Sequence, residues 1–249
     1  MNDKIQALAE IIRKSNRIVF FGGAGVSTES GIPDFRSPSG LYKVKTTVPS
    51  LKDVPYSAEE MISHHFFMEN NQLFFDYYFH ALVYPSALPN EAHKFLAKLE
   101  QTGRLKAIVT QNIDGLHQMA GSKNVLELHG SIHRNYCMKC GTFYDLEGIT
   151  QNHAKCPKCG GIIKPDVVLY EESLDEDTIT QSVEAIMQAD CLIIGGTSLS
   201  VYPAAGFVRY FRGRYLVIIN KEATSMDQYA TLSINEAIGE VFKQVDQLL

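Results

Sequence analysis

Two kinds of segment alternate along this chain, and their hydrophobic patterns differ. Short apolar runs without polar alternation are typical of strands buried on both faces of a parallel sheet, and they occupy residues 18–21, 107–110, 191–194 and 215–219. Apolar residues at helical spacing occupy residues 3–14, 90–101, 175–189 and 235–248. Strands that alternate with amphipathic helices predict βαβ units and a doubly wound α/β sheet. Ligands of such sheets bind at the carboxyl ends of the strands, so the residues after each run are candidates for a site.

Two segments interrupt this alternation. Residues 37–89 are rich in proline and aromatic side chains, which predicts a loop followed by a helical insertion, and residues 132–170 contain paired cysteines. The second segment is too short to build a core unaided, whereas 249 residues suffice for one large core and one small core. We therefore expect a main domain with a minor lobe.

Composition and charge exclude several classes of protein. The chain is 45% hydrophobic and 20% charged, and its 23 basic and 28 acidic residues give a net charge of −5 without a basic block. Nucleic acids and anionic membranes are held by clustered positive charge, so we expect neither as a partner. No apolar run approaches the ~18 residues of a membrane span, and no secretion signal precedes residue 18. We expect a cytoplasmic monomer.

Four of the five cysteines form two C-x-x-C pairs. Cys137 and Cys140 are separated from Cys156 and Cys159 by fifteen residues, which is the spacing of a four-thiolate zinc ribbon. A closed tetrahedral site has no open position for catalysis, so we expect one structural zinc ion per chain. A thioredoxin-like redox role explains two paired motifs less well. Cys191 begins an apolar run and is interpreted as a buried small residue.

Glycine-rich sequence follows the first predicted strand, at residues 22–27. Glycines at 23 and 25 let the backbone approach a pyrophosphate, but the third glycine of the dinucleotide motif is absent at its usual offset. Asp34, Phe35 and Arg36 follow and could hold a carboxamide, cover a ring and reach a phosphate. Alternatively this is a surface loop, with the phenylalanine in the core and the two charges paired.

Polar residues also follow the second strand, in the segment 110–117. Asn112 and Asp114 there could bind a ligand or could cap the next helix. His129 follows the apolar residues 126–128, where a histidine is either a hydrogen-bonded structural residue or a general base.

The order of these motifs resembles that of the sirtuins, the NAD-dependent protein lysine deacylases. The resemblance extends from about residue 18 to about residue 221 and includes Gly196-Thr197-Ser198 as well as His129-Gly130. It implies a large Rossmann-like domain formed by residues 1–36, 90–131 and 171–249. A helical module at 37–89 and the zinc ribbon at 132–170 would form the small domain, with the active site in the cleft between the two domains.

The resemblance also implies a set of NAD contacts along the strand ends: Ala24, Thr28, Phe35, Arg36, Gln111, Asn112, Ile113, Asp114, Thr197, Ser198, Asn220 and Ile238. Phe35, Ile113 and Asp114 would line the nicotinamide pocket, and Gln111 and Asn112 would face the ribose. In this scheme the acyl oxygen captures the ribose carbon as nicotinamide leaves, with His129 as general base and Asn112 as a second catalytic residue. Free lysine, nicotinamide and O-acyl-ADP-ribose are the expected products.

The acyl-lysine substrate would bind as an added strand, beside Val168 and Tyr170 on one side and Val201 on the other. Main-chain pairing of this kind predicts broad tolerance of substrate sequence. The helical module carries Phe75 and Tyr78 where desuccinylating members of the family have a tyrosine and an arginine, so neutral acyl groups are favoured.

Two other residues depart from the family pattern. Gly22 stands where threonine is more common, and Glu171 replaces a glycine beside the substrate strand.

Three other functions are compared with deacylation. Protein mono-ADP-ribosyl transfer has less need of His129, and a non-enzymatic NAD-sensing module leaves the polar strand ends unexplained. A dehydrogenase would need an acidic ribose ligand after a second strand, and none is clearly placed there.

Overall fold

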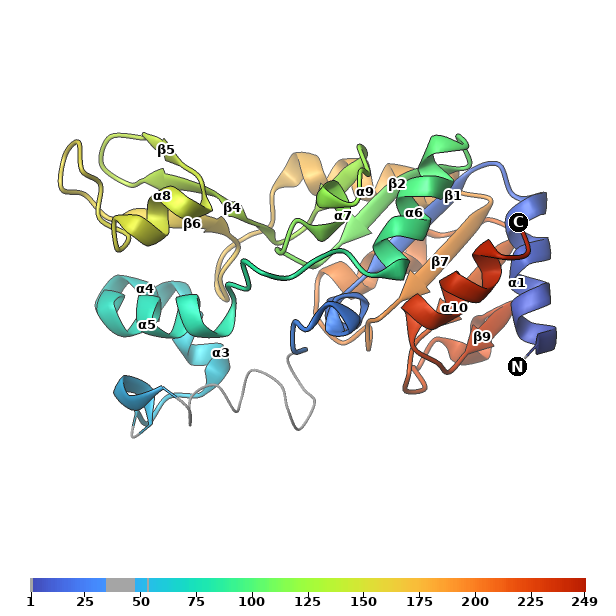
Figure 1. The fold of residues 1–249 in the computed structure, drawn as a ribbon, viewed down its shortest axis with the longest axis horizontal. Helices are drawn as coiled ribbons and strands as arrows, with labels where there is room; N and C mark the ends of the chain where they lie inside the picture. The colour runs from blue at the N-terminus through green and yellow to red at the C-terminus, as the bar shows by residue number, and fades with distance from the viewer. Residues whose placement is uncertain (1, 35–47, 53) are drawn as a thin grey trace.

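A computed structural model describes residues 2–34, 48–52 and 54–249 (Figure 1). The molecule is elongated, with a large α/β domain at one end and a smaller lobe of short helices and strands at the other (Figure 1). Both termini lie on the large domain, beside α1 (Figure 1). The chain leaves this domain after residue 34 and returns to it at α6, so the helical module is an insertion.

Six parallel strands form the sheet of the large domain, in the order β3-β2-β1-β7-β8-β9. Their bounds are β1 Ile18–Gly22, β2 Leu105–Thr110, β3 Val125–Glu127, β7 Cys191–Gly195, β8 Tyr215–Ile219 and β9 Leu232–Ile234. The strand order reverses between β1 and β7, and such a reversal opens a crevice at the carboxyl ends. The doubly wound sheet predicted from the apolar runs is confirmed. β9, which has only three residues, was not predicted.

Helices cover both faces of this sheet. On one face, α1 Asn2–Lys14, α6 Glu91–Gln101 and α10 Ile238–Asp246 share a core with the strands. On the other, α9 Glu176–Gln188 and the 3-10 segment η4 Ala204–Tyr210 form a second core. Successive strand residues point to opposite faces, so Phe20 enters the first core and Phe21 the second. Both side chains are fully buried, which explains why this run has no polar alternation.

The smaller lobe combines the two interrupting segments. Its antiparallel sheet has the order β5-β4-β6, with β4 Gly130–Cys137, β5 Phe143–Tyr144 and β6 Ile163–Val167. Its helices are α3 Ala58–Met61, α4 His64–Glu69, α5 Asn71–Ala81 and α8 Leu146–Gln151, together with the 3-10 turn η3 Pro49–Leu51. One hydrophobic cluster joins Phe67 and Phe74 of the helices to Ile132 and Ile163 of the sheet. The two segments therefore share a single core.

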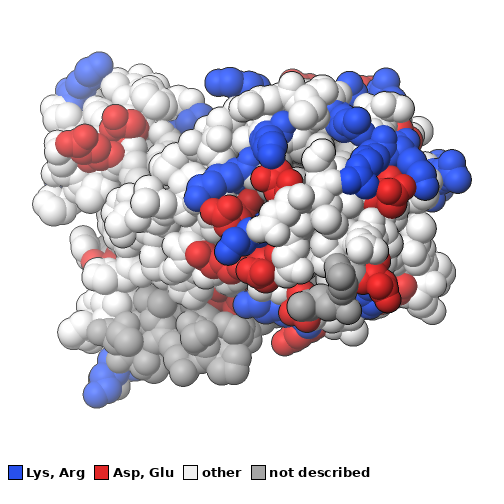
Figure 2. All heavy atoms as spheres, turned by 45° about the vertical axis from the view of Figure 1, so that its right-hand side comes forward, with Lys and Arg blue, Asp and Glu red and all other residues white. Residues whose placement is uncertain are grey.

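The surface carries both signs of charge. On the face drawn in Figure 2, Lys and Arg side chains lie among Asp and Glu side chains. This agrees with the scattered basic residues of the sequence. Over the described part of the chain, no helix combines the length and the apolar character that crossing a membrane requires.

Candidate functional site

The four paired cysteines converge in the smaller lobe. Their sulfur atoms all lie within 4.8 Å of one another. The Cys137 and Cys159 sulfurs are 3.4 Å apart, and those of Cys140 and Cys156 are 3.7 Å apart. A tetrahedral zinc ion with thiolate bonds of about 2.3 Å gives sulfur–sulfur distances of about 3.8 Å. The four side chains therefore fit a structural zinc ion, whereas Cys191 is buried in β7.

Three glycines bring the loops after β1 and β7 into main-chain contact. Gly25 N–H donates to the Gly196 carbonyl at 2.8 Å. A Cβ atom on Gly25 would lie 2.8 Å from Gly196 Cα, and one on Gly23 would lie 2.9 Å from Thr197 Cβ. Such distances exclude side chains at both positions. The two loops thus form a concave main-chain surface at Gly23, Gly25 and Gly196, here called the glycine cradle. It lies where the strand order reverses, which is where a pyrophosphate is expected to bind.

Gly22 has a separate steric explanation. A Cβ atom at this position would lie 2.6 Å from the Phe20 ring and 3.3 Å from Val26 Cγ2. The threonine that is more common in the family therefore does not fit beside Phe20 without a shift of that ring. Glycine at this position avoids that contact.

The end of β2 joins the same cradle. Gln111 N–H donates to the Gly22 carbonyl at 3.0 Å, and the Gln111 side-chain amide donates to Thr197 Oγ1 at 3.3 Å. Two residues that are 86 positions apart in the sequence, and that the resemblance implies for NAD, therefore touch.

Ser27 connects the polar residues of the two loops. Its hydroxyl donates to Asp114 Oδ2 at 2.6 Å and accepts from Asn112 Nδ2 at 3.1 Å. Asp114 Oδ1 accepts from the N–H of Leu116, the first residue of α7 Leu116–Met119. Burial raises the pKa of Asp114, while the hydrogen bonds from Ser27 and Leu116 act to lower it. Asp114 thus supports the helix start and also belongs to the site, and Ser27 is a residue that our sequence analysis missed.

His129 is held by one hydrogen bond of defined direction. Its Nδ1 lies 2.9 Å from the Gln111 carbonyl oxygen, which can only accept, so Nδ1 carries the proton. The lone pair of the neutral ring is then on Nε2. Burial lowers the pKa of His129, and the bond to Gln111 only partly opposes this. The ring is therefore neutral at pH 7 and able to accept a proton at Nε2.

The segment expected to pair with substrate lies next to His129. Val168 N–H donates to the His129 carbonyl at 3.0 Å, and Tyr170 pairs with Ser63 in a parallel bridge. Leu169 N–H donates to Glu172. The N–H groups of residues 168–170 are thus used within the chain. The carbonyl oxygens of Leu169 and Tyr170 also accept hydrogen bonds, from Glu172 N–H at 3.0 Å and from His64 N–H at 2.9 Å. Val201 is half-buried.

Glu171 and Glu172 tie this segment to α4. Glu171 has a φ of 76°, a left-handed conformation that glycine adopts more easily, and its carboxylate accepts from His65 N–H at 2.9 Å. Glu172 accepts from Leu169 N–H and pairs with Lys164 at 3.1 Å and with His64 at 2.8 Å. Burial raises the pKa of Glu172, but the contacts with His64, Leu169 N–H and Lys164 outweigh it, so the pKa is lowered.

The remaining residues predicted to contact NAD differ in their exposure and in their contacts. Ala24 and Thr28 lie in two successive 3-10 turns, η1 Ala24–Val26 and η2 Thr28–Ser30, and Ser198 is exposed. The Asn220 side chain donates to the Glu222 carbonyl at 2.8 Å. Ile238 is only 2% exposed because it packs on Gly195, so it offers little surface to a ligand. Phe35 and Arg36 lie outside the described residues. Ile113 packs against the core of the smaller lobe.

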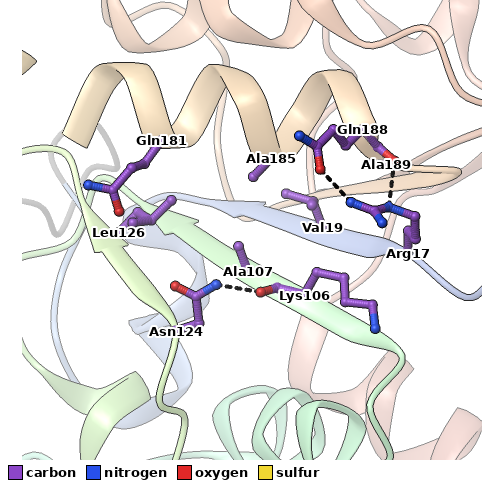
Figure 3. A pocket seen from close by; sticks show the side chains of 10 residues that line it. All are labelled: Arg17, Val19, Lys106, Ala107, Asn124, Leu126, Gln181, Ala185, Gln188 and Ala189. Atoms are coloured by element: carbon purple, nitrogen blue, oxygen red, sulfur yellow. Dashed lines mark hydrogen bonds between the residues drawn. The ribbon is translucent and has the colours of Figure 1, made fainter. Parts of the chain in front are cut away.

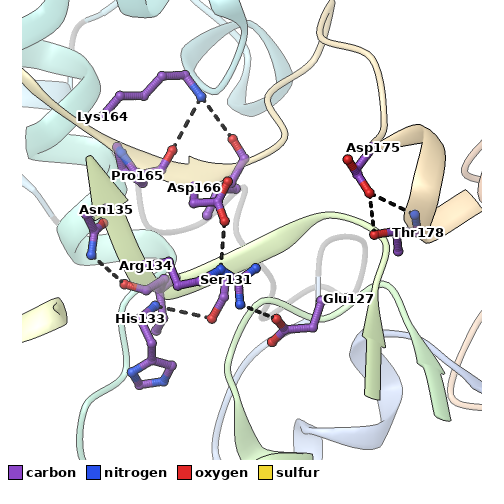
Figure 4. A network of polar contacts seen from close by, with 12 residues as sticks. Glu127, Ser131, His133, Arg134, Asn135, Lys164, Pro165, Asp166, Asp175 and Thr178 are labelled. Carbon is purple, nitrogen blue, oxygen red and sulfur yellow. Dashed lines mark hydrogen bonds and ion pairs between the residues drawn. The ribbon is translucent and has the colours of Figure 1, made fainter. Parts of the chain in front are cut away.

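An ion-pair network joins the two sheets (Figure 4). Arg134 of β4 contacts Glu127 of β3 at 2.6 Å and Asp166 of β6 at 2.7 Å. The Glu127 side chain is 9% exposed, so it depends on this partner. The sequence carries no periodic signal for such a contact, and we did not predict it.

A hollow of about 190 Å³ lies away from these residues. Its lining comes from the amino ends of β1, β2 and β3 and from α9 (Figure 3). Arg17 and Gln188 hydrogen-bond to each other at its rim. None of the predicted site residues lines it, and Gln111 and Thr197 lie after the opposite, carboxyl ends of β2 and β7.

Fold and site together define an α/β nucleotide-binding protein with an added four-cysteine lobe. The model of the Sir2 family matches residues 23–203. A Clostridium perfringens protein named NAD-dependent protein deacetylase is 59% identical over 248 residues, which cover 98% of this chain and 99% of that relative. The chain belongs to the Sir2 family.

Solved structures agree with this assignment along the whole chain. A Sir2 structure with a p53 peptide and NAD+ has a TM-score of 0.85 and 34% identity, with 98% of both chains covered. A Sir2 variant with a deacetylated p53 peptide and 3′-O-acetyl ADP ribose has a TM-score of 0.86 and 35% identity at the same coverage. The Rossmann-like fold predicted from the resemblance is confirmed.

Proposed function

We propose that this protein is an NAD-dependent protein lysine deacetylase that transfers the acyl group to ADP-ribose. One observation carries the proposal. The glycine cradle of β1 and β7 meets the end of β2, whose Gln111 carbonyl fixes the proton of His129 on Nδ1. Relatives named NAD-dependent protein deacetylases support the same activity.

The strand-end loops would bind NAD as co-substrate. The lack of side chains at Gly23 and Gly25 lets its phosphates approach the main chain there, and Ile113 and Asp114 suit the nicotinamide group. Asn112, oriented by Ser27, would face the nicotinamide ribose. The other proposed contacts are Ala24, Thr28, Phe35, Arg36, Gln111, Thr197, Ser198, Asn220 and Ile238.

The reaction needs an acceptor for a ribose proton. Breaking the bond between ribose C1′ and nicotinamide builds positive charge on C1′, and the acyl oxygen bonds to that carbon when it is held in line and shielded from water. His129 Nε2 then removes a ribose hydroxyl proton, so that the 2′-oxygen attacks the acyl carbon. One water is consumed, and free lysine, nicotinamide and O-acyl-ADP-ribose are released.

The substrate is an acyl-lysine peptide added as a strand beside Val168, Tyr170 and Val201. Phe75 and Tyr78 are buried in an aromatic cluster and supply no cation for an acyl carboxylate, which supports neutral acyl groups. The zinc ion would hold together the small domain, residues 37–89 and 132–170. The net charge of −5 supports a monomer that does not bind nucleic acid, and bacterial relatives support a cytoplasmic enzyme.

The test is incubation with an acetyl-lysine peptide, with and without NAD. We expect loss of the acetyl group only with NAD, and equal amounts of nicotinamide, deacetylated peptide and O-acetyl-ADP-ribose by mass spectrometry. ADP-ribose attached to the peptide or to the protein, without deacetylation, would instead indicate a mono-ADP-ribosyltransferase. NAD binding without any product would indicate a sensing module.

A further inference from the structure

Asn90 stands where the chain returns from the helical module to the large domain. It is the N-cap of α6, and its Oδ1 accepts from Ala92 N–H at 2.9 Å. Its own N–H donates to His93 Nδ1 at 3.2 Å, which completes a reciprocal cap. The cap uses the side-chain oxygen and leaves the amide nitrogen for another partner.

That nitrogen reaches the loop after β1. Asn90 Nδ2 donates to the Val26 carbonyl at 2.8 Å and to Ser30 Oγ at 3.0 Å. Both hydrogens of the amide group are thereby used. The two contacts lie on either side of Ser27, the residue that orients Asn112 and Asp114. One side chain thus holds both flanks of the segment that shapes the proposed NAD site.

His93 stabilises Asn90 in this position. Because His93 Nδ1 accepts a hydrogen bond from Asn90 N–H, it cannot carry a proton, and the ring must stay neutral. His93 is fully buried, and burial lowers its pKa to about 4. The neutral ring therefore persists throughout the physiological pH range, and the main chain of Asn90 remains fixed.

We propose that Asn90 is a positioning residue for NAD binding, which acts by holding residues 26–30 in their binding conformation before NAD arrives. This inference rests on the proposed function, because it assigns these loops to NAD. A loop that is ordered in advance loses less conformational entropy on binding. Removing the Asn90 contacts should therefore weaken NAD affinity more than it lowers kcat.

The test uses Asn90→Asp. Aspartate caps a helix as well as asparagine does, but it presents an oxygen to the Val26 carbonyl in place of the donor. We expect the Kd and KM for NAD to rise about tenfold, the equivalent of one hydrogen bond, with the peptide KM and kcat changed less than about twofold. Asn90→Ser keeps the cap without the repulsion and should show a smaller effect in the same direction.

Asp145→Asn serves as the matched control, because Asp145 caps α8 in the zinc ribbon through Gly148 N–H. It should leave NAD binding unchanged. If the wild type binds NAD and both Asn90 variants bind it equally well, the inference is wrong while the proposed function stands. If Asn90→Asp does not fold, Asn90→Ser alone decides. A wild type that does not bind NAD overturns both.

Discussion

At the scale of single residues, the direction of a hydrogen bond determines the chemistry. The Gln111 carbonyl can only accept, so it fixes the tautomer of His129 and leaves Nε2 available. Sequence reasoning identified His129 and the loop of Gln111, but not the bond between them. Ser27 and Asn90 escaped it for the same reason, since nothing in their local sequence says which distant atom they meet.

Replacing His129 by alanine should separate binding from turnover. We expect NAD affinity within about threefold of wild type, because the residues proposed to hold NAD are all kept, and kcat lowered about 10²–10⁴-fold, as is typical for loss of a general base. Calorimetry and the deacetylation assay measure the two effects. His80→Ala, an exposed histidine of α5, is the control. Deacetylation at the wild-type rate would refute the role of His129.

The pH dependence of kcat/KM follows from the same residue. The base must be neutral to act, and burial lowers the pKa of His129 below 6.5. Activity should therefore stay high as the pH falls to about 6.5 and decline only below that value. A decline that begins well above pH 7 would contradict a buried, neutral imidazole.

We expect the Asp114 carboxylate to lower folding stability while it strengthens the binding of NAD. Its pKa is raised by burial, so the ionised form is disfavoured in the folded protein, and folding stability falls as the pH rises from about 3.9 through the raised value. Asp114→Asn keeps the acceptor for Leu116 N–H and removes this loss. We expect equal or higher thermal stability at pH 7 but weaker binding of NAD and of nicotinamide. Lower stability together with unchanged binding would oppose this assignment.

At the scale of elements, β4 connects the metal centre to the site. It begins one residue after His129 and ends at Cys137, a zinc ligand. Arg134 in its middle holds Glu127 of the large sheet. The zinc ribbon and His129 are therefore connected through a single strand, so disorder in the ribbon should displace His129.

Zinc removal should act through this strand. We expect one zinc ion per chain, and chelation should unfold the small sheet and abolish deacetylation while the large domain keeps its helical signal. Circular dichroism, metal analysis and the activity assay monitor the three effects. Full activity with less than one ion per chain would contradict a structural role.

The strands and helices of the large domain could be predicted because burial leaves a periodic pattern. The runs at 18–21 and 191–194 match β1 and β7 to within a residue, since both faces of these strands are covered. β9 escaped prediction because three residues carry no period. The arrangement of the small helices also escaped, because their common core with the ribbon depends on contacts between distant segments.

At the scale of the whole molecule, a buried histidine pair links stability to pH. His93 and His117 are 0% and 1% exposed, their ring centres are 4.8 Å apart, and neither nitrogen of His117 has a hydrogen-bond partner within the described chain. Burial lowers their pKa values to about 4 and about 3. The pair lies on α6 and α7 of the large domain, so its protonation affects the stability of that domain.

Acid should therefore destabilise the protein below pH 6.5. Both folded pKa values lie below the unfolded one, so the unfolded chain binds more protons, and stability is lost as the pH falls from about 6.5 to about 3. At 1.36 kcal/mol per pKa unit, His93 alone accounts for about 3 kcal/mol. His117→Phe should reduce this loss, measured by urea unfolding between pH 4 and pH 7. An unchanged pH dependence would be inconsistent with a buried neutral pair.

The most direct test of the account is the exchange of labelled nicotinamide into NAD, measured together with deacetylation in the wild type and in His129→Ala. Exchange requires that NAD is cleaved and re-formed beside the acyl-lysine, whereas deacetylation requires the later proton removal by His129. We predict exchange that depends on the acetyl-lysine peptide in both proteins, and deacetylation at an appreciable rate only in the wild type. Peptide-independent exchange, or equal deacetylation by the two proteins, would contradict the account.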